Sequence, residues 1–219
     1  MPVVLTSNFP RPGNDGVAAL VRNAVDHAAG LEWLSPADGA SRFDEARREL
    51  GDCGIHAVRA VDRAALVSSA AGAGLLLSGG HPTEFRQELS QPPLRAWLQH
   101  RLASAPVVVA ASGGAMQLTR NVSLFRLLQI DVQTVVRERS LYGALGCVPF
   151  EVLPHLNRQA PAFIEQVVEY SAQTAVDIWC LPDGAAVVWS EGSGVTTIGA
   201  ARLLRCGRWV DDRAGPVHA

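Results

Sequence analysis

A serine between small residues is the first candidate for chemistry in this sequence. Residues 107–116, VVVAASGGAM, run from β-branched residues through two alanines to Ser112 and two glycines. The run predicts a buried strand that turns sharply into a helix, and such an elbow exposes a serine hydroxyl for nucleophilic attack. Ala110 replaces the first glycine of the G-x-S-x-G pattern, so the stretch taken alone is better explained as an ordinary strand–turn–helix link.

A serine nucleophile needs a general base and an acid that orients the base. His155, in PFEVLPHLNR, is the best general base of the six histidines, because it lies in a rigid loop beside prolines. Asp183, at the Pro-Asp-Gly turn of IWCLPDGAAVVW, is the candidate acid. Turns favour aspartate without any catalytic role, so this interpretation depends on His155 lying nearby.

The developing oxyanion needs two N–H donors, and two glycine corners could supply them. The stretch LLLSGGHPTEF predicts a buried strand that ends at Gly79-Gly80, and the N–H groups of Gly80 and Gly113 are the expected donors. Taken alone, Gly79-Gly80 is better explained as a plain turn between a strand and a helix. The chain has no G-x-x-x-x-G-K sequence, which disfavours a phosphate-binding loop.

The elements that must position these groups alternate in the first half of the chain. Strands are expected at 3–7, 31–35, 55–59, 74–80 and 106–112, and helices at 15–29, 41–50, 62–71 and 93–104. This alternation predicts an α/β fold with a mainly parallel sheet sandwiched by helices. In the second half, strands are expected at 132–137, 176–181, 185–190, 194–200 and 201–206, with a helix at 161–173. They predict a short antiparallel C-terminal extension of one domain, 1–219, whose tail 210–219 frays.

Composition excludes several classes of function. The net charge of -2 gives no basic stripe for nucleic acid, and no apolar stretch approaches the roughly 20 residues of a membrane span. The N-terminus lacks the features of a signal peptide, so we expect a soluble, cytoplasmic protein. The chain has no lysine, which excludes a Schiff base, and its four cysteines form no CxxC pair. We therefore expect reduced thiols and no metal site.

Five segments in this order resemble the serine peptidases of the peptidase E and cyanophycinase family. They are VVLTSNF, GLLLSGGHPTEF, VVVAASGGAM, VPFEVLPHLNR and IWCLPDGAAVVW, and together they span roughly residues 3–200. The resemblance implies a class I glutamine amidotransferase-like fold, of the flavodoxin-like three-layer kind. It implies a cofactor-free serine peptidase acting on small peptides, Asp-Xaa dipeptides above all, and leaves a homodimer open. Ser112 matches the nucleophile, His155 the base, Asp183 the acid, and Gly80 and Gly113 the oxyanion hole.

The chain departs from the family pattern near these residues. Gly113 replaces the usual alanine, His81 stands where the family often has Asn or Asp, and Asp183 replaces a glutamate that is longer by one methylene. The shorter acid leaves Glu151, Asp177 and Glu191 as alternatives. The departures also leave open an inactive member of the family that binds a small ligand or a protein partner.

Two further classes of enzyme are ranked lower by chain order and residue type. An α/β-hydrolase-type esterase runs Ser, acid, His, and would need Asp131 or Glu138 as its acid, in a stretch expected to be a strand. A glutamine amidotransferase would need a cysteine at the elbow, and none of the four cysteines lies there.

The side-chain carboxylate of an Asp-Xaa substrate calls for a cation in or beside the cleft. Without lysine, the cation must be an arginine or a protonated histidine. Arg120 follows the elbow by two helical turns and Arg158 follows His155 by three residues. Together with His81, they are the expected substrate-binding residues, since an arginine can hold a carboxylate with two parallel hydrogen bonds.

Overall fold

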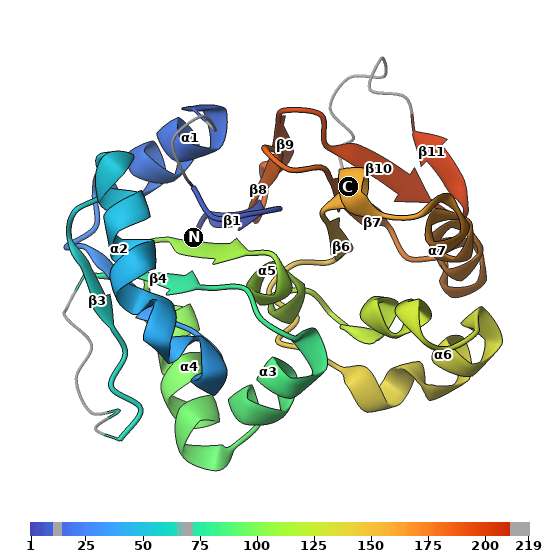
Figure 1. The fold of residues 1–219 in the computed structure, drawn as a ribbon, viewed down its shortest axis with the longest axis horizontal. Coiled ribbons are helices and arrows are strands. Elements are labelled where there is room, and N and C mark those ends of the chain that lie inside the picture. The colour runs from blue at the N-terminus through green and yellow to red at the C-terminus, as the bar shows by residue number, and fades with distance from the viewer. Residues whose placement is uncertain (11–14, 65, 67–71, 211–219) are drawn as a thin grey trace.

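The computed structural model describes residues 1–10, 15–64, 66 and 72–210 (Figure 1). The first half alternates strands and helices as the sequence predicts. Its strands are β1 (Val3–Thr6), β2 (Leu31–Leu34), β3 (Val58–Ala60), β4 (Gly74–Leu77) and β5 (Val108–Ala111). Its helices are α1 (Asp15–Val25), α2 (Phe43–Asp52), α3 (Pro82–Leu89) and α4 (Pro92–Ser104), with a 3-10 turn, η1, at Ala37–Arg42.

The main sheet has seven strands in the order β3-β2-β4-β5-β1-β8-β9. The strands from β3 to β1 are parallel, and β8 (Ala186–Ser190) and β9 (Gly194–Ile198) add an antiparallel edge beside β1. The predicted fold class, a mainly parallel α/β sheet covered by helices, is confirmed. The carboxyl ends of parallel strands meet at one edge of such a sheet, which is where sites form in this class of fold.

Helices cover both faces of this sheet because the strand side chains alternate between two cores. Val4 and Val109 pack with Val17 and Val21 of α1, whereas Val3 and Val108 face the opposite core. That opposite core holds the apolar side chains of α3 and α4, which are Phe85, Leu89, Leu94, Trp97 and Leu98. The strands β1, β2, β4 and β5 are therefore buried on both faces.

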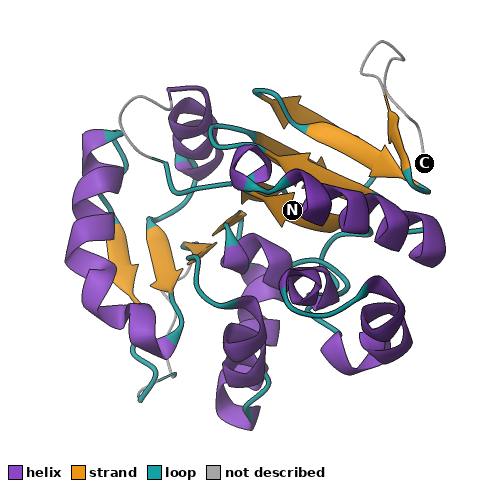
Figure 2. Ribbon diagram, turned by 45° about the vertical axis from the view of Figure 1, so that its right-hand side comes forward, coloured by secondary structure: helices purple, strands orange, loops and turns teal. Residues whose placement is uncertain are grey.

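The second half forms a separate four-stranded sheet in the order β11-β10-β7-β6. Its strands are β6 (Glu151–Pro154), β7 (Ile178–Leu181), β10 (Arg202–Arg205) and β11 (Arg208–Val210). The β6 and β7 strands are parallel, and the remaining pairs are antiparallel. Helix α7 (Pro161–Thr174) packs on this sheet and, with α6 (Val132–Glu138), lies on the right of Figure 1, away from α1, α2 and α4 (Figure 2).

Several predicted elements differ in the structure. The strand expected at 132–137 is wrong: this segment is α6, because the Asp131 carboxylate accepts a hydrogen bond from the Thr134 N–H at 2.9 Å and caps the helix. Val132 and Val135, three residues apart, then face the core. The strand expected at 55–59 is observed as the shorter β3. Helix α3 and strand β6 were not predicted. Most of the helix expected at 62–71 and of the tail at 210–219 lies outside the described residues, although Val210 ends β11.

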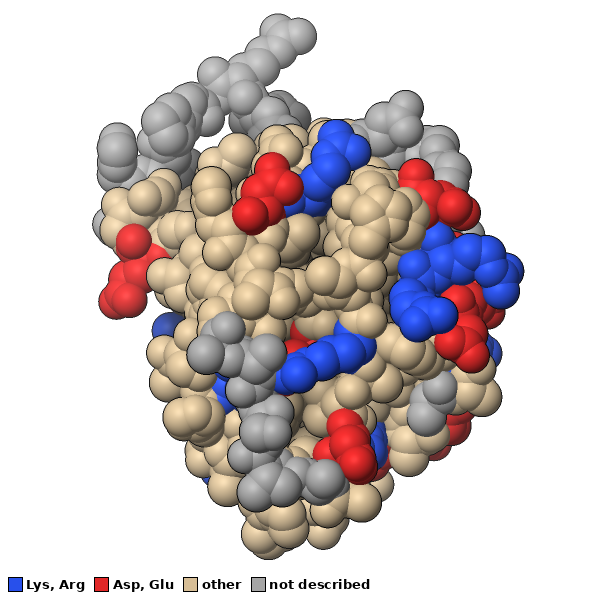
Figure 3. Space-filling view, turned by 90° about the vertical axis from the view of Figure 1, so that its left-hand side faces the viewer, with Lys and Arg blue, Asp and Glu red and all other residues tan. Residues whose placement is uncertain are grey.

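Charged side chains of both signs lie next to one another on the surface. The face in Figure 3 shows arginines beside carboxylates and no broad field of one sign, in keeping with the net charge of -2. No helix in the part of the chain that the structure describes has the length and apolar character needed to cross a membrane.

Candidate active site

Ser112 lies at a strained turn between β5 and α5 (Gly113–Gln117). Its φ is 53° and its ψ is -123°, a backbone conformation that residues with a side chain rarely adopt. The Ser112 N–H donates to the Thr6 carbonyl at 3.0 Å and so fixes the turn to the end of β1. This is the elbow geometry that the sequence suggested, and it lifts the hydroxyl clear of the sheet.

The two glycine corners pack backbone against backbone. A Cβ added at Gly113 would overlap the Gly80 carbonyl oxygen, and one added at Gly114 would overlap the Ser78 carbonyl oxygen. Neither glycine has a positive φ, so the requirement is for close approach and not for backbone freedom. Glycine at these positions lets the end of β4 lie directly on the elbow. Within the described chain, the N–H groups of Gly80 and Gly113 donate no hydrogen bond.

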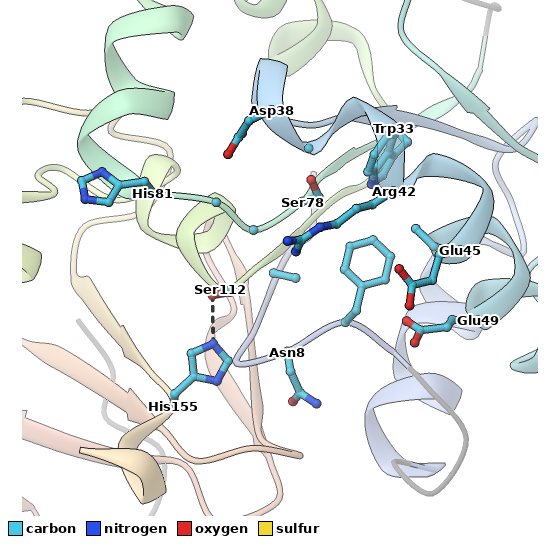
Figure 4. A pocket seen from close by; sticks show the side chains of 16 residues that line it. Asn8, Trp33, Asp38, Arg42, Glu45, Glu49, Ser78, His81, Ser112 and His155 are labelled. Carbon is cyan, nitrogen blue, oxygen red and sulfur yellow. Dashed lines mark hydrogen bonds between the residues drawn. The ribbon is translucent and has the colours of Figure 1, made fainter. Parts of the chain in front are cut away.

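His155 follows β6 and reaches the serine from the second sheet. Its Nε2 atom lies 2.9 Å from Ser112 Oγ, shown as a dashed line in Figure 4. His155 itself has a left-handed backbone, with φ 57° and ψ 38°. The Ser7 hydroxyl holds this conformation by accepting the His155 backbone N–H at 2.9 Å.

Asp183 lies in the turn between β7 and β8 and completes the chain of contacts. Its Oδ1 atom is 2.7 Å from His155 Nδ1. A carboxylate can only accept, so Nδ1 carries the proton and Nε2 is free to accept the Ser112 hydroxyl hydrogen. The structure therefore brings the three predicted catalytic side chains together in the order serine, histidine, aspartate.

The second oxygen of Asp183 is also occupied. Arg158 Nε lies 2.6 Å from Oδ2, and Asn157 Nδ2 lies 3.4 Å from the same oxygen. Partial burial raises the pKa of Asp183, but the hydrogen bonds from His155, Arg158 and Asn157 outweigh it and hold the pKa below its usual value. The carboxylate stays charged while it orients the imidazole.

The alternative acids lie in other contacts. Glu151, at the start of β6, is buried with Arg139 and Tyr170, at 2.6 and 3.1 Å. Asp177 forms a two-point ion pair with Arg205. Glu191 is exposed and forms no hydrogen bond or ion pair with another described residue. Of the two acids that an α/β-hydrolase order would need, Asp131 caps α6 and Glu138 pairs with Arg126.

Two cavities flank Ser112, and both are also lined by His155, Gly80 and His81. The larger has a volume of about 560 Å³ and extends under η1 and α2 (Figure 4). We call it the charged cavity, because its lining includes Asp38, Arg42, Glu45 and Glu49. The smaller has a volume of about 130 Å³ and is called the apolar cavity, because its lining includes Met116, Phe125, Leu128, Leu153 and Phe163.

The residues expected to bind the substrate lie in different places. His81 lines both cavities, but Arg120 is exposed and lines neither of them. Arg158 holds the Asp183 carboxylate. The arginine that does line a cavity is Arg42, whose guanidinium extends toward Ser112 in Figure 4. Arg42 was missed because its segment is far from the catalytic motifs in the sequence.

Among the described residues, no three or more His, Cys, Asp or Glu side chains form a group that could hold a metal ion. Within the part of the chain that the structure describes, Cys53, Cys147, Cys180 and Cys206 form no disulfide. Burial raises the pKa of Cys147 to about 11 and that of Cys180 to about 12, so both remain protonated at neutral pH.

The fold and the side-chain arrangement define an α/β protein with a serine, histidine and aspartate site at a nucleophile elbow. The sequence model of peptidase family S51 matches residues 43–198, and the chain belongs to this family. The resemblance to peptidase E and its relatives is thereby confirmed, and the general activity is that of a peptidase. A search of curated proteins finds no match.

Two solved structures show the same fold. A peptidase from an acI-B1 Actinobacterium superposes with a TM-score of 0.72 at 16% identity, over 98% of this chain and 95% of that one. A putative peptidase E protein from Listeria monocytogenes EGD-e superposes with a TM-score of 0.64 at 19% identity, over 90% of this chain and 97% of that one. At these identities the likeness is one of fold.

Proposed function

We propose that this protein is a serine peptidase that hydrolyses small peptides with an N-terminal aspartate, using Ser112, His155 and Asp183. The observation that supports the proposal most directly is the unbroken series of contacts, 2.9 Å from Ser112 to His155 and 2.7 Å from His155 to Asp183. Both distances lie within the range for proton transfer and orientation in such a triad.

In this mechanism Ser112 Oγ attacks the carbonyl carbon of the scissile amide while its proton moves to His155 Nε2. The tetrahedral intermediate carries its charge on the former carbonyl oxygen, which the N–H groups of Gly80 and Gly113 can bind. His155 then gives the proton to the leaving amine as the carbon–nitrogen bond breaks. Water hydrolyses the resulting acyl-enzyme by the same steps, with His155 again as the base.

The charged cavity suits the N-terminal residue of an Asp-Xaa peptide. This residue carries a side-chain carboxylate and an α-ammonium group, and the cavity offers groups of both signs. Arg42, Glu45 and Glu49 have no ion-pair partner among the described residues. Arg42, whose guanidinium points toward Ser112 in Figure 4, would hold the carboxylate, and Glu45 and Glu49, one helical turn apart, would hold the ammonium.

Hydrolysis of Asp-Leu and Asn-Leu tests both parts of the proposal. Ser112→Ala should lower kcat by several orders of magnitude with the fold intact, and an unchanged rate would remove Ser112 from the mechanism. The unmodified protein should prefer Asp-Leu, and Arg42→Gln should erase a preference of about 10- to 100-fold, the worth of one charged hydrogen bond. Arg48→Gln, at an exposed position of the adjacent helix α2 that lines neither cavity, is the matched control. Equal cleavage of both peptides by the unmodified protein would refute the aspartate specificity while leaving the serine mechanism in place.

A further inference from the structure

The apolar cavity adjoins the charged cavity at Ser112, and it is not lined by Arg42 or its neighbouring carboxylates. Its lining contains no carboxylate and no guanidinium, and its titratable side chains are the imidazoles of His81 and His155. Leu128, at its rim, is half exposed although it is a large aliphatic residue. Exposed apolar side chains that border a cavity next to a reactive group mark a binding surface.

The position of this cavity follows from the residues it shares with the charged cavity. Ser112 and His155 line both, so a peptide carbonyl placed over Ser112 borders both cavities. If the charged cavity takes the N-terminal residue, the residue whose amine receives the proton from His155 must extend into the other cavity. That second residue is the leaving group of the reaction.

We infer that the apolar cavity binds the side chain of the leaving residue, and that the substrates are Asp-Xaa peptides in which Xaa is apolar and about the size of leucine. This inference rests on the proposed function. The size follows from the volume of about 130 Å³. An apolar cavity of roughly 150 Å³ accommodates benzene, so a branched four-carbon side chain fits here.

His81 is placed to meet the other end of the leaving residue. In a dipeptide this residue carries an α-carboxylate, which an apolar cavity excludes. His81 lines both cavities, is partly exposed, and packs its ring edge-on against Phe125 with 4.9 Å between centroids. Its Nδ1 atom contacts Thr83 Oγ1 at 2.9 Å, which leaves Nε2 available to the carboxylate.

The preference is measured with Asp-Leu, Asp-Ala, Asp-Arg and Asp-Glu as substrates of the unmodified protein. We expect kcat/KM for Asp-Leu to exceed that for Asp-Ala by about 10- to 100-fold, because binding transfers the methyl groups of leucine from water into the apolar cavity. Asp-Arg and Asp-Glu should fall at least as low as Asp-Ala. Cleavage of Asp-Arg or Asp-Glu as efficient as that of Asp-Leu would overturn the inference.

Two exposed leucines provide a matched pair of variants. Leu128 and Leu141 are 50% and 63% exposed, so both should tolerate aspartate without unfolding, and Leu128 alone of the two lines the apolar cavity. Leu128→Asp should lower kcat/KM for Asp-Leu about tenfold and raise the ratio of Asp-Arg to Asp-Leu cleavage. Leu141→Asp should change neither. Equal effects of both variants on this ratio would contradict the assignment.

Binding to Ser112→Ala, measured by calorimetry, examines the cavity without turnover. Asp-Leu should bind this variant at least about tenfold more tightly than Asp-Arg. If the unmodified protein cleaves none of the four peptides but the variant binds Asp-Leu selectively, the proposed peptidase activity fails and the cavity assignment stands. If the unmodified protein cleaves all four peptides equally well, the peptidase activity stands and the cavity assignment fails. Equal binding of Asp-Leu and Asp-Arg to the Ser112→Ala variant also overturns the assignment.

Discussion

Replacing Gly113 by alanine tests how closely the two glycine corners are packed. Relatives that the sequence resembles usually have alanine at this position, so the exchange looks conservative. In this chain, however, a Cβ at position 113 would overlap the Gly80 carbonyl oxygen and lie 3.1 Å from the Gly80 carbon and nitrogen. Ordinary van der Waals contact with a Cβ begins near 3.4 Å, and the atoms in the way are backbone atoms that no rotamer change can move.

The size of the effect follows from the distance that the backbone must move. Relief of the overlap requires a shift of about 1 Å between the elbow and the Gly79-Gly80 corner, and misplacement of that size costs about 10²-fold in rate. Overpacking of this kind also lowers the free energy of unfolding by about 1–3 kcal/mol. The better helix propensity of alanine at the start of α5 offsets at most about 1 kcal/mol of this loss.

The assay compares kcat/KM for Asp-Leu and urea unfolding of the unmodified protein, Gly113→Ala and Gly143→Ala. Gly143 is the matched control, because a Cβ added there meets nothing within 4 Å and its φ is not positive. We expect Gly113→Ala to lose activity about 10²-fold and Gly143→Ala to lose none. A Gly113→Ala protein as active and as stable as the unmodified one would refute the role of the close approach between the corners.

Two further predictions concern the residues that hold the imidazole. Ser7→Ala leaves the partly buried His155 N–H without its acceptor, so the free energy of unfolding should fall by about 1 kcal/mol and kcat should fall with it; unchanged values for both would contradict the role of Ser7. Arg158→Gln removes an ion pair that lowers the pKa of Asp183, so this pKa should rise and the activity that is lost on acidification should be lost at a higher pH. Arg120→Gln, at an exposed site outside both cavities, should leave the pH profile of kcat/KM unchanged. If the Arg158→Gln profile were identical to the Arg120→Gln profile, the role of Arg158 in lowering the pKa of Asp183 would be refuted.

The sequence was most informative where several segments could be considered together. The elbow at Ser112 and the corner at Gly79-Gly80 each fit an ordinary turn when taken alone. His155 was the best of the six histidines because helices, strands and the tail accounted for most of the others. The order of the segments along the chain then favoured the catalytic interpretation.

The charged cavity could not be predicted in this way. Arg42 lies at the end of η1, in a stretch whose residues equally fit a solvated helix surface. Only the packing of η1 and α2 over the carboxyl edge of the sheet brings it to Ser112. Arg158 and Arg120 were chosen for nearness in sequence, which says little about where a long side chain ends.

The wrong prediction of a strand at 132–137 has a different cause. VQTVVR is rich in β-branched residues, and the preference of these residues for strands outweighed the helical spacing of Val132 and Val135. The deciding contact is the single cap from Asp131 to the Thr134 N–H. Capping at a helix start can override weak propensity over a short segment.

The identity of the acid illustrates how loop structure can replace side-chain length. Asp183 is one methylene shorter than the glutamate usual in the family, yet its carboxylate lies 2.7 Å from the imidazole. Its backbone N–H donates to Asn157 Oδ1 at 2.7 Å, and the next N–H, of Gly184, donates to Asn8 Oδ1 at 3.0 Å. Since these two asparagines hold the turn against the loops that carry His155 and Ser7, the backbone itself supplies the reach. Glutamate at position 183 should therefore place its carboxylate beyond His155 Nδ1. The shorter side chain of aspartate matches the position in which the two asparagines hold the turn.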